Sequence, residues 1–154
     1  MKILHVIDNM SMGGAQSLLV EMLPVQKQMG NEVLVLELKA SEDRTLANKL
    51  QKSGIEVRAL AAIRTERNVK NIFELIPYIK QYEIVHVHLF PANYWVAFAK
   101  ILSFSNTPII TTEHSTNNKR RKILIFKYID KFIYSQYEDC LLYTSPSPRD
   151  RQKS

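Results

Sequence analysis

The sequence has a single cysteine, Cys140, and no long hydrophobic run. One cysteine excludes an internal disulfide, which suits a reducing compartment. Charged residues interrupt every apolar stretch well before the roughly 20 residues that a membrane-spanning helix requires, so no such helix is expected. Residues 1–8 contain too short an apolar run for a secretory signal and lack a small-residue cleavage site. We therefore expect a cytoplasmic protein.

The composition that remains is that of one ordinary globular domain. The chain has 154 residues, of which 45% are hydrophobic and 23% are charged, close to average globular usage. This length fits one domain or a piece of a larger protein. The net charge of +6 is modest, and no basic stripe interleaved with aromatic residues is present, so nucleic acid is not an expected partner.

Residues 140–154 differ from everything before them. They are rich in Ser, Pro and Arg and show no apolar period, which fits a disordered tail. A codon string for Cys140–Asp150 also resembles a transposon-type sequencing adapter read in one frame, so the segment is interpreted as read-through from a gene cut near Glu138 or Asp139. We therefore assign residues 1–139, with a net charge of +4, to the domain and residues 140–154 to a non-native or disordered tail.

Short apolar runs alternate with helical periods along residues 1–139. Strands are predicted at residues 2–7, 32–38, 55–60, 84–88, 108–112 and from 131, and helices at residues 15–29, 45–53, 70–81, 92–102 and 119–129. This alternation predicts an α/β fold, a Rossmann-like doubly wound parallel sheet with helices on both faces. Ligands bind such a sheet beyond the carboxyl ends of its strands, here at residues 8–14, 86–91 and 111–116.

The segment Met12–Gln16 lies where the first strand turns into the first helix. Gly13 and Gly14 would let a ligand approach the backbone, and a helix N-terminus offers free N–H groups and partial positive charge, which suits phosphate or a sugar hydroxyl. A turn that requires a positive φ explains these glycines equally well. The spacing Gly-x-Gly-x-x-Gly is absent, which argues against a dinucleotide-binding epimerase or dehydrogenase.

Three histidines lie within, at the end of, or just after predicted strands. His86 and His88 share one face of a strand, but no carboxylate or cysteine lies nearby to complete a metal site, so no metal is expected. His86 is interpreted as a hydrogen-bonded core residue and His88 as facing the crevice. Histidine as a residue type titrates near neutral pH, and His114 follows a strand at the same rim, so it is the best single candidate for the active crevice. The alternative there is a turn in which Ser115 or Thr116 caps the next helix.

Four cations, Lys119, Arg120, Arg121 and Lys122, are predicted to begin a helix, where the helix dipole is also positive. An anionic ligand or an acidic membrane surface would offset this repulsion, with peripheral attachment at the inner face of the membrane. A solvated basic turn is the alternative.

Five segments occur in the order and spacing of one family. They are Lys2–Ile7, Met12–Gln16, Tyr82–His88, Pro108–Ser115 and Ile129–Ser135. Together they resemble the N-terminal domain of a retaining glycosyltransferase of family 4, which has the GT-B architecture. The resemblance covers essentially all of residues 1–139, and it implies a truncated chain.

The resemblance implies two Rossmann-like domains, of which the N-terminal one binds the acceptor and the C-terminal one the nucleotide-sugar donor. It implies a hexosyltransferase of polysaccharide biosynthesis that retains configuration and needs no cofactor or essential metal. The family's donor domain, with two glutamates separated by seven residues, is missing from this sequence. We therefore expect the fragment to be inactive alone. A stand-alone Rossmann-like module that binds a phosphorylated or lipid-linked ligand is the alternative.

The resemblance also assigns roles to matching residues. Gly13 and Gly14 would lie beside the donor diphosphate and the acceptor. His114 would contact the transferred sugar, with Ser115 beside it as a further substrate-binding candidate, and His88 would lie near the acceptor pocket. Gln16, also a substrate-binding candidate, stands where the family more often has Glu, which leaves its role open.

Overall fold

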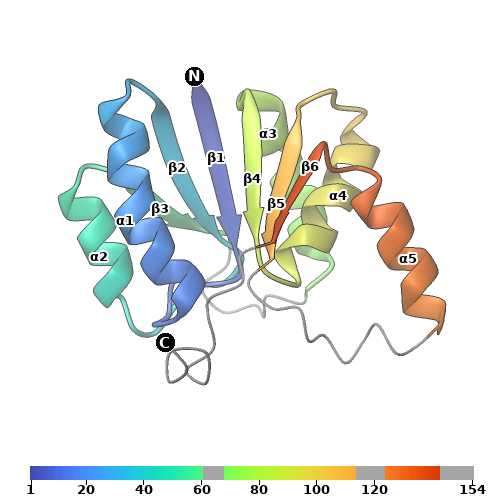
Figure 1. Ribbon diagram of the computed structural model, residues 1–154, viewed down its shortest axis with the longest axis horizontal. Helices are drawn as coiled ribbons and strands as arrows, with labels where there is room; N and C mark the ends of the chain where they lie inside the picture. Colours follow the sequence, from blue (N-terminus) through green and yellow to red (C-terminus); the bar gives the residue numbers. More distant parts are fainter. Residues whose placement is uncertain (61–67, 114–123, 143–154) are drawn as a thin grey trace, which may run out of the picture.

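The computed structural model describes residues 1–60, 68–113 and 124–142. Its six-stranded sheet has the order β3-β2-β1-β4-β5-β6, and each neighbouring pair is parallel (Figure 1). The strands are β1 (Lys2–Ile7), β2 (Glu32–Glu37), β3 (Glu56–Ala59), β4 (Ile84–His88), β5 (Ile109–Glu113) and β6 (Asp139–Leu142). The helices are α1 (Gly14–Gln28), α2 (Thr45–Lys52), α3 (Lys70–Gln81), α4 (Ala92–Ser103) and α5 (Leu124–Tyr134). The predicted Rossmann-like doubly wound fold is confirmed.

Two apolar layers cover the two faces of the sheet. Because side chains alternate along a strand, Leu4 and Val6 pack with residues of α3 and α4 on one face. Ile7 packs with residues of α1 and α2 on the other face. Figure 1 shows these two pairs of helices on opposite sides of the strands. His5 alternates with Leu4 and Val6, so it belongs to the face that α1 covers.

Helix α1 buries a different stripe from the one with the best period in the sequence. Its buried apolar residues are Ala15, Leu19 and Leu23, whereas Val25, in the stripe that Leu18, Met22, Val25 and Met29 form at helical spacing, is exposed. Two apolar stripes lie side by side on this helix, and a period of three and four fits both. Only packing against the sheet selects the stripe that contains Leu19, and burying each leucine side chain contributes about 2 kcal/mol.

The predicted elements after residue 118 are displaced. The strand expected from Lys131 is wrong, because residues 131–134 form the last turn of α5 and the strand lies at Asp139–Leu142. Three consecutive apolar residues, 132–134, fit a short strand and a helical turn equally well. Ile133 is fully buried in the core on the α4 side, whereas Phe132, its neighbour on the same helix, is exposed.

The boundary between the domain and the tail, predicted at residue 139, falls inside β6. The backbone of Cys140–Leu142 pairs with Thr111–Glu113 of β5. A disordered tail beginning at Cys140 is therefore wrong for these three residues. Residues 143–154 lie outside the described ranges.

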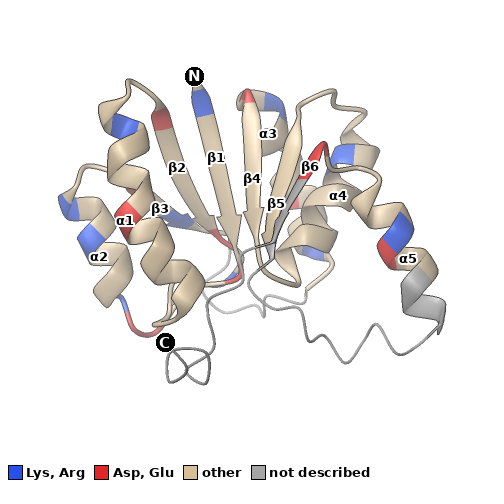
Figure 2. Cartoon of the chain, viewed as in Figure 1, with Lys and Arg blue, Asp and Glu red and all other residues tan. Residues whose placement is uncertain are grey.

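Charged residues are dispersed over the elements that the structure describes (Figure 2). Among these elements no helix combines the length and apolar character needed to cross a bilayer.

Candidate functional site

The carboxyl ends of the central strands form one row. Strand β1 lies between β2 and β4, where the strand order reverses, and this is the position at which doubly wound sheets bind ligands. Ile7 is in register with Glu37 on one side and His88 on the other, and His88 is in register with Thr112. The loops that follow these residues therefore begin at the same edge of the sheet.

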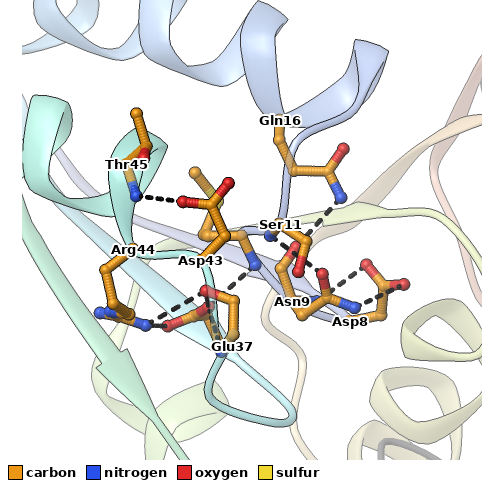
Figure 3. A network of polar contacts seen from close by, with 10 residues as sticks. Asp8, Asn9, Ser11, Gln16, Glu37, Asp43, Arg44 and Thr45 are labelled. Carbon is orange, nitrogen blue, oxygen red and sulfur yellow. Dashed lines mark hydrogen bonds and ion pairs between the residues drawn. The ribbon is translucent and has the colours of Figure 1, made fainter.

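The loop between β1 and α1 is held by its own polar groups (Figure 3). The Asn9 N–H donates to Asp8 Oδ1 at 2.8 Å, and the Ser11 N–H donates to Asn9 Oδ1 at 3.0 Å. Gln16 Nε2, from the first turn of α1, donates to the Asn9 carbonyl at 3.1 Å. A glutamate could not donate this bond when ionised, so Gln16 has a structural role that a glutamate could not fill.

The two glycines of this loop have different reasons to be glycine. Gly13 has extended backbone, with φ −172° and ψ 169°, so the predicted alternative of a positive-φ turn is wrong there. A Cβ on Gly13 would lie 2.4 Å from Gln16 Oε1, and glycine therefore makes room for that side chain. A Cβ on Gly14 would meet nothing within 4 Å. Gly14 begins α1, whose N-terminus has no side-chain cap.

Glu37, which the sequence reasoning missed, is fully buried at the end of β2. Its Oε1 accepts from the Met10 N–H at 2.8 Å, the Ser41 hydroxyl at 3.0 Å and the Ser41 N–H at 3.3 Å. Its Oε2 pairs with the Arg44 guanidinium (Figure 3). A carboxylate that ends an otherwise apolar strand was the available signal, since buried charges require partners.

A polar hollow of about 280 Å³ lies beside this network, between the loops that follow β1 and β2. It is lined by Asn9, Ser11, Lys39, Ala40, Ser41 and Glu42. The lining offers hydroxyl, amide, ammonium and carboxylate groups, and it contains no aromatic side chain. Such a mixture of donors and acceptors suits a ligand that carries several hydroxyl groups.

A buried histidine cluster lies on the α1 face of the sheet. His5, which the sequence reasoning also missed, is in register with His86, and His88 is two residues further along β4. His5 Nδ1 lies 3.1 Å from His88 Nε2, and His5 Nε2 lies 2.9 Å from Gln26 Oε1 of α1. His86 Nε2 shares a hydrogen bond of 2.7 Å with the Thr112 hydroxyl. The predicted core interpretation of His86 agrees with this contact.

The protonation state of this cluster follows from its burial. Burial, with a smaller contribution from His86, lowers the pKa of His5 from 6.5 to about 3, although the bond to Gln26 opposes this change. Neutral His5 has one N–H, which donates to Gln26 Oε1, so its Nδ1 accepts. The Nε2–H of His88 is then the donor to His5.

The nitrogens of these three histidines lie within 4.8 Å of one another, a set that could hold a metal ion by composition. Two zinc ligands must point at a third position about 2.0–2.1 Å from each nitrogen. The rings of His5 and His88 are nearly parallel, with their centroids 5.4 Å apart and the two nitrogens 3.1 Å apart. The difference between these distances equals about one ring width, so both nitrogens lie on the line that joins the two ring centres. These nitrogens therefore face each other, as in a hydrogen bond and not as in shared metal coordination.

The structure describes only part of the predicted site. His88 is 1% exposed and bonded to His5, so its side chain is not open to the rim as expected. Gln16 is buried against its own loop. The remaining candidates lie outside the described residues: His114, Ser115, Lys119, Arg120, Arg121 and Lys122.

Solved structures with the same fold include three larger proteins. MurG of Acinetobacter baumannii has a TM-score of 0.62 at 12% identity, over 95% of this chain and 42% of its own. UDP-GlcNAc 2-epimerase of Neisseria meningitidis, solved with UDP-GlcNAc bound, has a TM-score of 0.61 at 14% identity, and the match covers 99% of this chain and 42% of the epimerase. A glycosyltransferase of Rickettsia africae has a TM-score of 0.58 at 19% identity, and the match covers 92% of this chain and 42% of that protein. The chain thus spans less than half the length of each.

No curated protein matches the sequence significantly. The sequence profile of Glycosyltransferase Family 4, in contrast, matches residues 12–153. That range begins in the glycine-containing loop after β1 and includes the carboxyl ends of β2, β4 and β5. With a match along most of its length, the chain belongs to Glycosyltransferase Family 4.

Proposed function

We propose that this chain is the acceptor-binding, N-terminal half of a hexosyltransferase that moves a sugar from a nucleotide-sugar donor to an acceptor hydroxyl with retention of configuration. The observation that carries the proposal is the family match along residues 12–153, in a chain that spans only 42% of similar larger folds. The UDP-GlcNAc bound to the Neisseria epimerase supports a nucleotide sugar as the donor class. Polysaccharide biosynthesis is the role that we assign to the complete enzyme.

The acceptor is assigned to the polar hollow between the loops that follow β1 and β2. Its lining side chains, among them Asn9, Ser11 and Lys39, can bind several hydroxyl groups at once. The hollow adjoins the reversal in strand order, where doubly wound sheets bind ligands. An acceptor hydroxyl held there would face the donor half of the complete cleft.

The donor diphosphate is assigned to the N-terminus of α1. The first N–H groups of a helix have no partner within it and attract anions, and Gly14 leaves open space beside them. Such fixed dipoles stabilise the negative charge that develops as the diphosphate departs. The second half of the cleft is needed to place the donor, so we propose that the 154-residue chain alone has no transferase activity.

Recovering the genomic DNA downstream of codon 138 tests this proposal directly. We expect an open reading frame that encodes a second domain with two glutamates separated by seven residues. The complete enzyme, given UDP-, GDP- and dTDP-sugars with a panel of methyl glycosides, should transfer sugar, and the short chain should not. A stop codon just after codon 138 would contradict the transferase and support a stand-alone binding module. In the complete enzyme, His114→Ala should lower turnover at least about tenfold.

Peripheral attachment to an anionic membrane is a second part of the proposal. Tyr128 is 75% exposed and Phe132 is 54% exposed on α5, and Ile129 lies beside them. The basic run 119–122 precedes this helix in the sequence, and apolar residues next to cations are typical of helices that lie on anionic membranes. Sedimentation with vesicles should show binding that requires anionic lipid and that Phe132→Ser weakens. Equal binding to neutral vesicles would contradict this attachment.

A further inference from the structure

Glu37 connects two loops that are far apart in the sequence. Its carboxylate accepts a hydrogen bond from the Met10 N–H of the β1–α1 loop, 27 residues away. It also accepts a hydrogen bond from the Ser41 hydroxyl and pairs with the Arg44 guanidinium, both in the segment between β2 and α2. Its side chain is fully buried, whereas that of Arg44 is 34% exposed. Removing a carboxylate from water costs several kcal/mol unless hydrogen bonds replace the lost hydration. The bonds from both loops supply that replacement, so both must stay in place.

Of the residues that Glu37 holds, Ser41 lines the hollow itself and Met10 stands directly between two that do. Met10 lies between Asn9 and Ser11, which form one wall, and Ser41 lies between residues 40 and 42 in the other wall. Figure 3 shows Glu37 between the segment that bears Ser11 and the segment that bears Arg44. A change in the position of this carboxylate therefore moves both walls relative to each other.

We propose that Glu37 is a positioning residue that fixes the spacing of the two walls and thereby selects the acceptors that fit between them. The proposal rests on the proposed function, in which the hollow receives the acceptor. Glu37 itself touches no substrate. It acts through the Met10 N–H on one side and through Ser41 and Arg44 on the other.

Glu37→Gln is the informative variant because it removes the charge of this link and keeps its size. With the amide oxygen in the place of Oε1, the amide NH₂ faces the guanidinium of Arg44, where two donors meet and the ion pair is lost. The N–H and the hydroxyl of Ser41 then bond to a neutral oxygen in place of a carboxylate, which is a weaker acceptor, so the wall that contains Ser41 and precedes Arg44 is held less firmly. Asp43→Asn is the matched control, because Asp43 lies in the same segment, accepts the Thr45 N–H at 2.9 Å and does not line the hollow.

Amide hydrogen exchange on the 154-residue chain tests the coupling without any ligand. In Glu37→Gln the Ser41 amide should exchange at least about tenfold faster than in the wild type, which corresponds to about 1.4 kcal/mol. Asp43→Asn should leave the Ser41 rate unchanged. If Glu37→Gln fails to fold, Arg44→Lys weakens the same link and should accelerate the same amide. Equal Ser41 exchange rates in the wild type, Glu37→Gln and Arg44→Lys would overturn the coupling.

Steady-state kinetics on the complete enzyme test the effect on the acceptor. With the best methyl glycoside of the panel, Glu37→Gln should raise the acceptor KM at least about fivefold and change the donor KM less than about twofold. Equal changes in both KM values, or a change in kcat alone, would overturn the positioning role. An enzyme that transfers no sugar to any glycoside would contradict the proposed function, and the exchange rates would still decide whether Glu37 couples the walls.

Discussion

Acid should destabilise this domain steeply because folding buries His5 as a neutral imidazole. The pKa of His5 is about 3 in the folded chain and 6.5 in its ordinary state. Below pH 6.5 the unfolded chain binds a proton that the folded chain excludes, so stability is lost as the pH falls towards 3. One pKa unit corresponds to about 1.4 kcal/mol, and the loss from this residue is therefore about 2 kcal/mol at pH 5 and about 4 kcal/mol at pH 3.

Urea denaturation at several pH values between 7.5 and 4.5 measures this loss in wild type and His5→Gln. The variant lacks the imidazole bonds to Gln26 and His88, so it should be less stable at pH 7.5 by about 1–3 kcal/mol. Its free energy of unfolding should then fall less steeply with acid, and the two curves should converge.

A control must show that a variant does not lose its dependence of stability on pH merely because it is less stable. Leu19→Ala removes a fully buried leucine of α1 on the same face of the sheet, at a cost of about 2–5 kcal/mol. It leaves the histidines in place, so its dependence on pH should equal that of the wild type. Parallel curves for wild type and His5→Gln between pH 7 and pH 5 would refute the reasoning.

Three further predictions concern stability measured by chemical or thermal denaturation. Gly13→Ala should lower the free energy of unfolding by about 1 kcal/mol, because the added Cβ displaces Gln16. Gly14→Ala should leave stability unchanged or stabilise α1 by up to about 1 kcal/mol. Equal losses of stability at both positions would contradict this account of the loop. Gln16→Glu should cost about 1–3 kcal/mol at pH 8, because a carboxylate cannot donate to the Asn9 carbonyl, and unchanged stability would show that this bond contributes little. Phe104 has φ 51° and is 93% exposed, so Phe104→Gly should raise Tm by relieving about 1 kcal/mol of backbone strain, and a lower Tm would show that the ring stabilises the turn.

The fold was predictable from local patterns over most of the chain. Helix α3 has the predicted bounds, Lys70–Gln81, and β4 the predicted bounds, Ile84–His88, because apolar period and turn residues act over a few neighbouring positions. The same rules failed after residue 118, where apolar residues 132–134 fit either element. In α1 they identified the helix but not its buried side, because two adjacent stripes were equally apolar.

The rim of the site was also predictable, since Gly13, Gly14 and His88 follow or end apolar runs and parallel strands bring such ends together. The contacts of these residues were not predictable. Gly13 was expected to allow a ligand or a positive-φ turn; its backbone is extended, which excludes the turn, and its missing Cβ makes room for Gln16. His88 was expected to face the crevice, and it is buried against His5, 83 residues earlier.

The sequence by itself determined the alternation of strands and helices, the family and the loops that form the rim, because these depend on residue order and short-range periodicity. Only the tertiary structure decided that Glu37 joins two loops and that His5 is held neutral between Gln26 and His88. A buried polar group takes whatever partners the packed chain brings within about 3 Å. Those partners lie on other strands and helices, and sequence spacing carries no information about which of them will meet.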